Sequence, residues 1–222
     1  MIRVFVGQDD VENVAYHVLS NSIIRNSTEP VSIAPIKLSN LVDIYDRVPD
    51  ENASNEFSLS RFLVPYLCNF DGYAIFMDCD MLMRADISEL WAMRDPTKSV
   101  QVVKHDYTPK TKTKFLGQTQ HDYPRKNWSS VMLFNCKKCK YLTPHYINTA
   151  PPKELHRFYW ADSIGELPKE WNHLVGEYAP DKKAKLAHFT IGGPYFHDYR
   201  DTEFSDEWFG EYERLNNCDQ IR

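Results

Sequence analysis

Two carboxylates at the end of an apolar run form the pattern in this chain with the clearest chemical use. Residues 73–80 read Tyr-Ala-Ile-Phe-Met-Asp-Cys-Asp, so an apolar stretch leads directly into Asp78 and Asp80. Such a stretch predicts a buried strand, and side chains two positions apart in a strand point to the same side. Both carboxylates can therefore converge on one point, where they repel each other unless a cation lies between them. A divalent cation with a substrate phosphate is the usual partner of such a pair.

The place of the two acids along the predicted strand also favours a binding site. They stand at its carboxyl end, which is the edge where open α/β sheets bind their ligands. The alternative is a strand end that turns into solvent, with the acids acting as helix caps. The surrounding sequence favours the site, because the pattern extends well beyond the two acids.

The run 76–91 resembles the metal-binding signature of nucleotide-sugar glycosyltransferases of family 8, which have the GT-A fold. It contains the strand, the Asp-x-Asp, a short apolar piece, and an Asp-Ile-x-x-Leu turn that opens a helix. The resemblance implies an α/β protein of the GT-A (nucleotide-diphospho-sugar transferase) fold, with a mostly parallel sheet and flanking helices. It also implies a hexosyltransferase that needs Mn²⁺ or Mg²⁺ and moves a sugar from a nucleotide-diphosphate sugar to a glycan or other hydroxyl acceptor, with retention of configuration.

The resemblance gives donor-binding roles to two further segments. The first predicted strand ends in Gly7, Gln8 and Asp9, where family 8 enzymes meet the base and ribose of the donor. The alternative is a plain helix N-cap from Asp9 or Asp10. Arg61, before the Asp-x-Asp strand, is similar to a family arginine that reaches the nucleotide phosphate or the acids. An arginine beside two carboxylates offsets their repulsion and keeps them ionised.

The run 186–196 resembles the closing motif of family 8, His-Phe-x-Gly-x-x-Lys-Pro-Trp. The resemblance makes His188 a third metal ligand beside Asp78 and Asp80, since imidazole and carboxylate together suit Mn²⁺. The alternative for a single histidine is a structural role in the core. Through the bound ion, Asp78 would also contribute to binding of the donor nucleotide.

The same motif carries two glycines and lacks one lysine. Gly192 and Gly193 would let backbone N–H groups approach the donor diphosphate. Gly193 stands where the motif has its lysine, which would neutralise the departing diphosphate. Either another cation does this, with Lys185 and residues 110–126 as candidates, or the donor or the catalytic competence differs. A non-catalytic module that binds a nucleotide sugar or a glycan is therefore an alternative function.

Two more segments resemble parts of family 8, each with a departure from the pattern. Residues 127–135 are similar to Asn-Ser-Gly-x-apolar-x-Asn, with Ser130 in place of the glycine, and simple core packing is the alternative for this strand. Residues 160–172 are similar to an Asp-Gln-Asp-x-x-Asn region, of which Asp162 survives. The resemblance places a polar group here beside the reacting sugar carbon, so Asp162 is the candidate catalytic residue. A carboxylate there would stabilise developing positive charge.

A second alternative belongs to another enzyme class. Haloacid-dehalogenase-like phosphatases also have an apolar-Asp-x-Asp-x-apolar pattern, which residues 75–82 satisfy. Those enzymes carry the pattern near the N-terminus and need a downstream lysine and an acidic Gly-Asp motif. Neither feature is evident in this sequence, so the phosphatase is the weaker alternative.

The elements that must position these residues alternate between strands and helices in the first half of the chain. Strand-like segments lie near residues 2–6, 31–36, 73–77, 99–104, 130–134 and 185–189. Helical periodicity is found near residues 11–26, 56–68, 86–93, 137–148, 153–160 and 205–216. The alternation predicts a largely parallel sheet covered on both faces. Residues 105–127 have no period, are rich in lysine and are too long for an ordinary connection, which predicts a functional or mobile loop.

Length and composition predict one ordinary globular domain over residues 1–222, with 197–222 as an aromatic-rich closing tail. Of the residues, 42% are hydrophobic and 26% charged, and the net charge of −5 argues against binding of a nucleic-acid backbone. No apolar run approaches the ~20 residues that span a bilayer, which leaves peripheral membrane contact open. The strand-like start also leads us to expect no signal peptide.

The cysteines predict a reducing compartment. There are five of them, without the spacing of a disulfide framework, so we expect reduced thiols and a cytoplasmic protein. Cys136 and Cys139 form a single C-x-x-C pair. A structural zinc site needs a second pair of ligands at compatible spacing, and Cys68, Cys79 and Cys218 stand alone, so we interpret the pair as the start of a helix.

Overall fold

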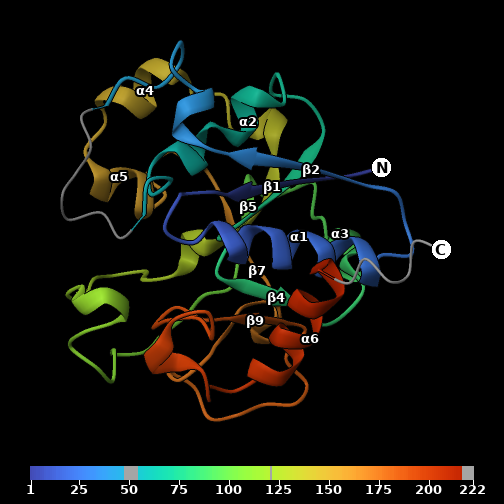
Figure 1. Cartoon of the computed structure of the whole chain (residues 1–222). Helices are drawn as coiled ribbons and strands as arrows, with labels where there is room; N and C mark the ends of the chain where they lie inside the picture. The colour runs from blue at the N-terminus through green and yellow to red at the C-terminus, as the bar shows by residue number, and fades with distance from the viewer. Residues whose placement is uncertain (48–54, 121, 217–222) are drawn as a thin grey trace.

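The computed structural model describes residues 1–47, 55–120 and 122–216, which form two β-sheets flanked by helices (Figure 1). The strands of the larger sheet follow the order β2 (Val31–Ile36), β1 (Ile2–Gly7), β3 (Tyr73–Met77), β6 (Val131–Asn135), β5 (Val100–Val102) and β7 (Ile164–Glu166). β1 is parallel to both β2 and β3, and β5 is parallel to β7, whereas β6 runs antiparallel between β3 and β5. The expected α/β fold with a mostly parallel sheet is confirmed, with β6 as its antiparallel strand.

A smaller sheet begins directly after β3. Its strands follow the order β4 (Met81–Met83), β9 (Leu186–His188) and β8 (His173–Leu174). Asp78, Cys79 and Asp80 alone separate the end of β3 from the start of β4. β9 is antiparallel to β4, and its register sets His188 opposite Met81. The two sheets therefore bring His188 next to the turn that carries both aspartates.

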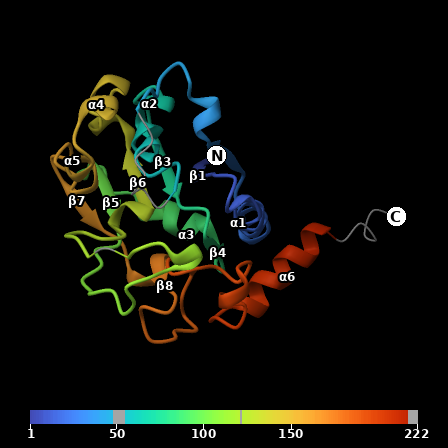
Figure 2. The same ribbon diagram turned by 60° about the vertical axis from the view of Figure 1, so that its left-hand side comes forward.

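Six α-helices surround the sheets within the described part of the chain. They are α1 (Asn13–Asn26), α2 (Val64–Leu67), α3 (Ile87–Ala92), α4 (Pro144–Thr149), α5 (Pro152–His156) and α6 (Ser205–Asn216). α1 packs against β4 and α6, as Figure 1 shows on its lower right. Figure 2 shows α2, α4 and α5 gathered on the opposite side of the molecule from α6. No helix among these is long and apolar enough to cross a membrane.

The apolar pattern of the strands explains the core. In β3 only Tyr73 is partly exposed, and every residue of β6 is buried, as expected for strands covered on both faces. Around them a large hydrophobic cluster joins the larger sheet to α1, α2 and α5. A second cluster around Trp208 packs α6 against the smaller sheet. The aromatic tail thus closes the second sheet, up to residue 216, where the described residues end.

The expected strands and helices are found close to their places, with a few informative differences. The helix expected over 56–68 is the short 3₁₀ turn η2 (Ser60–Leu63) followed by α2, and the one expected over 137–148 is η5 (Cys136–Lys138) followed by α4. Pro144 at the first turn of α4 explains the second break, because proline starts helices more readily than it continues them. β4, β7 and β8 were not expected, because strands of two or three residues carry almost no periodicity.

Candidate functional site

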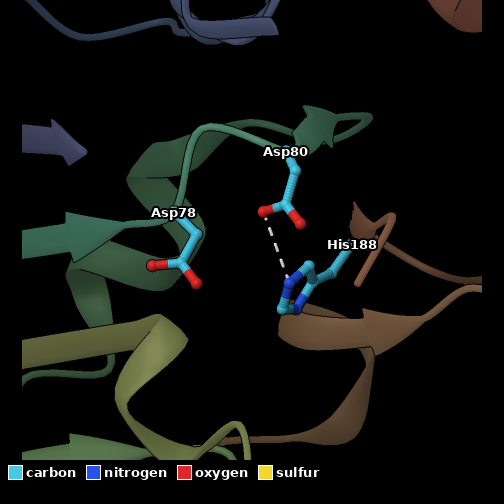
Figure 3. Close-up of side chains that lie close together, drawn as sticks. All are labelled: Asp78, Asp80 and His188. Atoms are coloured by element: carbon cyan, nitrogen blue, oxygen red, sulfur yellow. Dashed lines mark ion pairs between the residues drawn. The ribbon is translucent and has the colours of Figure 1, made fainter. Parts of the chain in front are cut away.

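Asp78 and Asp80 are held by backbone contacts on both sides of their turn. The Asp78 amide donates to the carbonyl of Ser130 at 3.0 Å, which extends the pairing of β3 with β6 by one residue. The Asp80 carbonyl accepts from the amide of Phe189 at 2.8 Å, just beyond β9. In Figure 3 the Asp80 carboxylate points toward His188, and the Asp78 carboxylate lies beside them. The convergence that the i, i+2 spacing predicts is thus set by one strand end from each sheet.

His188 faces Asp80 with a defined ring nitrogen. The Ser130 hydroxyl donates to the Asn127 carbonyl at 2.7 Å, so Ser130 Oγ accepts from the Asn172 amide at 2.8 Å. The oxygen of Asn172 then accepts from His188 Nδ1 at 2.8 Å, which assigns the neutral-ring proton to Nδ1. Nε2 is left 3.4 Å from Asp80 Oδ1. Because the lone pair of His188 Nε2 and the Asp80 carboxylate repel each other at this distance, a cation or a further proton between them would be stabilising.

These three side chains meet the geometric requirement for a divalent ion. One oxygen of Asp78, one of Asp80 and one nitrogen of His188 lie within 4.8 Å of one another, and all three residues are buried. Arg61 lies 2.7 Å from Asp78 Oδ1 in an ion pair, and a carboxylate oxygen has a second lone pair with which to bind an ion. Two carboxylates and one imidazole whose other nitrogen is held by an amide are a donor set that Mn²⁺ accepts. The residues present therefore fit a divalent metal.

Arg61 supports Asp78 through a buried ion pair. Its Nη1 lies 2.7 Å from Asp78 Oδ1 in an ion pair whose two members are almost fully buried. The guanidinium also donates to the carbonyls of Phe57 and Ser129 and lies over the ring of Phe76, 5.0 Å from its centre. These contacts fix its position, so Arg61 holds a permanent positive charge beside the two acids.

Burial and charge act differently on the two carboxyl groups. Burial raises the pKa of Asp78 to about 6, because the lowering effect of Arg61 does not fully compensate for desolvation and the nearby Asp80. Burial also opposes ionisation of Asp80, but the adjacent His188 outweighs it and holds the pKa of Asp80 below its ordinary value. Asp80 is therefore the more strongly ionised of the two, and Asp78 gains most from a cation.

The three residues lie in a pocket of about 310 Å³ that contains charged groups of both signs. Arg61, Ser129 and Asn127 belong to its lining. Lys114 and Lys126, from the long loop without period, line it too. The sequence singled out this loop as functional, and the structure brings two of its lysines to the same pocket as the Asp-x-Asp.

Glu12 and His156 are pocket residues that the sequence did not single out. Glu12 precedes α1 and is buried, and it accepts from the Tyr195 hydroxyl at 2.5 Å. Burial and the charge of Asp80 raise its pKa well above the ordinary value. His156 ends α5, and its Nδ1 lies 3.0 Å from Ser129 Oγ. Burial and Arg61 lower the pKa of His156 to about 3, so its ring is neutral.

The residues expected to meet the nucleoside lie at the end of β1, outside the lining of this pocket. Asp9 accepts from the Glu12 amide at 2.9 Å in the turn before α1, whose N-cap is Glu12 without a side-chain cap. The side-chain amide of Gln8 donates to the side-chain oxygen of Asn13. A Cβ on Gly7 would lie 2.3 Å from the ring of Phe57, so glycine there lets that ring pack on the backbone. Their nucleoside-binding role stays a prediction.

The glycines of the closing motif are buried beneath aromatic rings. A Cβ on Gly192 would lie 2.6 Å from the ring of Tyr199, and one on Gly193 would lie 2.1 Å from the ring of Tyr195. The Gly192 amide donates to the Phe189 carbonyl, and neither glycine lines the pocket. Close packing of rings on the backbone therefore accounts for both glycines, and their contact with a diphosphate stays a prediction.

Asp162 is not brought to the pocket. It is exposed, and it directly precedes Ser163 and β7. Ser163 contacts Ser99 at the start of β5, and Ser99 also contacts the end of β6 that lies opposite Tyr73. Asp162 therefore lies near the end of the strands opposite the end that carries Asp78. The catalytic role of Asp162 stays a prediction. The short β7, which the sequence did not reveal, decides this placement.

Solved structures with the same architecture are glycosyltransferases. The galactosyltransferase LgtC, in complex with donor and acceptor sugar analogues, superposes with a TM-score of 0.63 at 9% identity, over 98% of this chain and 97% of that one. GlyE of Streptococcus pneumoniae TIGR4 gives 0.61 at 12% identity, over 96% and 61%. The bifunctional glycosyltransferase WbbM gives 0.63 at 17% identity, over 95% of this chain and about half (49%) of that one. The fold is therefore the GT-A glycosyltransferase fold, as expected.

A comparison of sequences identifies the family. The chain is 45% identical over 225 residues to Protein CDI of Arabidopsis thaliana, which covers 96% of this chain and 87% of that protein. The chain therefore belongs to the family of Protein CDI. No model of a protein family matches it.

Proposed function

We propose that this protein is a metal-dependent glycosyltransferase, similar to family 8, that moves a sugar from a nucleotide-diphosphate sugar to a glycan or other hydroxyl acceptor with retention of configuration. The observation that carries the proposal is the meeting of Asp78, Asp80 and His188 Nε2 in the pocket of a GT-A fold. The orientation of His188 by Asn172 adds support, because metal-bound histidines usually donate their other N–H to an oxygen.

Asp78, Asp80 and His188 would hold Mn²⁺ or Mg²⁺. When bound, the ion supplies a Lewis acid for the oxygens of the donor diphosphate. Arg61 keeps Asp78 ionised and in place, through its ion pair and its two backbone carbonyls. Asn172 keeps the lone pair of His188 Nε2 directed at the site. These side chains are fixed before any ligand arrives, so little reorganisation opposes binding.

The reaction exchanges one bond at the anomeric carbon of the donor sugar. The bond from that carbon to the diphosphate oxygen breaks, and its electron pair stays on the oxygen. The acceptor oxygen bonds to the same carbon, and its proton passes to the departing diphosphate. Among the described residues, the carboxylates that line the pocket are Glu12, Asp78 and Asp80. Because two of these would bind the ion and Glu12 accepts from the Tyr195 hydroxyl, the diphosphate oxygen is the proposed proton acceptor.

The compartment is proposed from the cysteines. Cys68, Cys79, Cys136 and Cys139 are buried free thiols, and Cys218 lies outside the described residues. Buried reduced thiols suit a reducing compartment, which supports a cytoplasmic enzyme.

Release of a nucleoside diphosphate from nucleotide sugars tests the proposal. Purified protein is incubated with Mn²⁺ and a panel that combines several bases with several sugars, with and without a hydroxyl acceptor. The proposal predicts release from one or a few members, lost with chelator, and an axial or equatorial product linkage that matches the donor. Release that is unaffected by chelator contradicts the metal site.

The same assay separates the alternatives. A binding module would bind a nucleotide sugar in calorimetry but release no nucleoside diphosphate at any enzyme concentration. A phosphatase would release phosphate from simple phosphate esters. Either result contradicts the transferase. Tight metal-dependent binding together with transfer of the sugar to the acceptor supports it, because hydrolysis alone would release the sugar to water.

A further inference from the structure

Lys114 is a charged residue of the pocket to which no role has yet been given. It is only partly exposed and lines the pocket together with Asp78 and Asp80. Its ammonium group interacts electrostatically with the carboxylates of Asp80, Glu12 and Asp78. Yet none of the described carboxylates lies within 4.0 Å of its nitrogen. A half-buried cation that faces acids at a distance leaves room for a ligand between them.

The fold positions Lys114 through contacts of its neighbours. Residues 110–120, here termed the cover segment, turn back on themselves, with a bridge between Thr113 and Thr119. The Lys114 amide donates to Gln118 at 2.9 Å inside this turn. The Phe115 amide donates to the Ile191 carbonyl at 2.8 Å, and its ring stacks on Phe196 at 4.7 Å. The backbone of Lys114 is therefore fixed between the turn and the segment after β9.

Glu177 fastens both ends of the cover segment. One of its carboxylate oxygens accepts from the Lys110 amide at 3.0 Å, and the other accepts from the Gln120 side chain at 2.8 Å. Glu177 is buried, 4% exposed, so both hydrogen bonds are shielded from water. The cover segment, which carries Lys114 to the pocket, is thus held at both of its ends, at Lys110 and at Gln120.

Lys126 and Lys153 also line the pocket, whereas Lys185 and Lys112 do not. Lys185 pairs with Glu89 and Glu170, at 2.8 and 2.9 Å, and does not line the pocket. Lys112 is exposed on the cover segment. Lys126 lines the pocket, but its ammonium lies 4.8 Å from the centre of the Tyr123 ring. Of these lysines, Lys114 is the one that lines the pocket and interacts with the Asp-x-Asp carboxylates.

We propose that Lys114 binds the diphosphate of the donor from the side opposite the metal ligands and neutralises its charge as the sugar departs. A divalent ion would balance the charges of Asp78 and Asp80. Lys114 would then add a positive charge beside the two negative charges of a diphosphate that carries a substituent at each end. The inference rests on the proposed function, since it names a binding residue for the same donor.

The test is binding of inorganic pyrophosphate in the presence of Mn²⁺, measured by calorimetry. The variant Lys114→Gln removes the charge and keeps most of the side chain. Its matched control is Lys112→Gln, an exposed lysine two positions away on the same segment. Loss of one charge-assisted contact predicts about 10- to 100-fold weaker binding for Lys114→Gln. Lys112→Gln binds as the wild type does, and Lys114→Arg regains most of the affinity.

Equal affinity of Lys114→Gln and wild type overturns the inference, and so does a wild type that binds no pyrophosphate with Mn²⁺. The melting temperature of each variant shows whether a loss comes from misfolding, and recovery in Lys114→Arg excludes that cause independently. The proposed function is judged separately. If the protein binds pyrophosphate through Lys114 but turns over no nucleotide sugar, this inference holds and the proposed transferase activity is contradicted.

Discussion

The floor of the pocket and the cover segment above it are built in opposite ways. The floor consists of Asp78, Asp80 and His188 at the ends of β3 and β9, where pairing within two sheets fixes each backbone. The cover segment has one bridge and a short 3₁₀ turn, and two ends held by Glu177. The two hydrogen bonds of Glu177, the backbone contact of Phe115 with Ile191 and the stacking of Phe115 on Phe196 hold the cover, whereas strand ladders and buried apolar residues hold the floor.

This difference assigns different tasks to the two regions. Metal ligands must keep their positions within narrow limits, and strand ends provide that rigidity. A segment held by a few polar contacts opens at a lower free-energy cost than a strand does. A donor must enter and a nucleoside diphosphate must leave, so the side that opens is expected to carry the cation that contacts the diphosphate. Changes to the floor should therefore abolish binding, and changes to the cover should weaken it.

The largest effect is expected from Asp80→Asn. The neutral amide is a poorer ligand for a hard cation and no longer pairs with His188. We expect Mn²⁺-dependent binding of the donor diphosphate to fall by about 100-fold or more, above the range for residues that only orient ligands. The measurement is calorimetry with Mn²⁺ and a nucleoside diphosphate.

The matched control for Asp80→Asn is Asp162→Asn, an exposed aspartate at the other edge of the sheet. It should bind and turn over as the wild type does. A loss in Asp162→Asn with an unaffected Asp80→Asn would reverse our assignment, and it would restore the role that the sequence resemblance gives to Asp162.

A smaller effect on binding is expected from His188→Ala. Both carboxylates remain, so metal should still bind, about tenfold more weakly. Turnover should fall further than donor binding, because the diphosphate charge that the ion stabilises grows in the transition state. Donor affinity, nucleoside diphosphate release and melting temperature are measured on one preparation. The exposed His197→Ala serves as control.

The alternative for His188 gives the opposite result. If its role is only to fill the core beside Asn172, His188→Ala should lose thermal stability while turnover per folded molecule stays near that of the wild type. That outcome would contradict the proposal that His188 is the third metal ligand.

The pH dependence of Mn²⁺ binding tests the electrostatics of the floor. Burial raises the pKa of Asp78 to about 6 in the ion-free protein. The ion needs the ionised carboxylate, so protons compete with it below that value. Apparent Mn²⁺ affinity should be nearly constant above pH 7 and should drop by about tenfold between pH 7 and 5. An affinity that is flat over this range contradicts the raised pKa.

The smallest effect should come from Glu177→Gln, which keeps the size of the side chain but replaces one of its two accepting oxygens with a donor. One end of the cover segment loses its hydrogen bond, so Lys114 is held less firmly. We expect KM for the donor to rise about three- to tenfold, the range for one hydrogen bond, with Mn²⁺ affinity unchanged. The exposed Glu166→Gln is its control. A change in Mn²⁺ affinity would show that the cover and the floor are not independent.

The floor was largely predictable from the sequence because its signal is local. The i, i+2 spacing of Asp78 and Asp80 after a buried strand specifies their convergence without any knowledge of the rest of the fold. His188 needed the resemblance, since no local pattern links it to a strand more than a hundred residues earlier. Asn172, which orients it, lies in the run 160–172, where the resemblance gave a role to Asp162 but none to Asn172.

The cover and Asp162 were harder to predict for a physical reason. Lys114 sits in a segment without periodicity, and only contacts with Glu177 and Ile191 decide which of its lysines turns inward. Asp162 depends on β7, a three-residue strand whose pairing with β5 sets the sheet edge at which it lies. In both cases long-range contacts determine the position, and a single sequence does not display them.

Manganese in a crystal tests the central claim most directly. Crystals are soaked with Mn²⁺ and a nucleoside diphosphate, and anomalous scattering locates the ion without reference to the proposed ligands. We predict one strong peak in contact with Asp78, Asp80 and His188 Nε2, bridged to the diphosphate, at about 2.1–2.3 Å from its ligands. A nucleotide that binds with no peak there, or a peak ligated by other residues, would contradict the account.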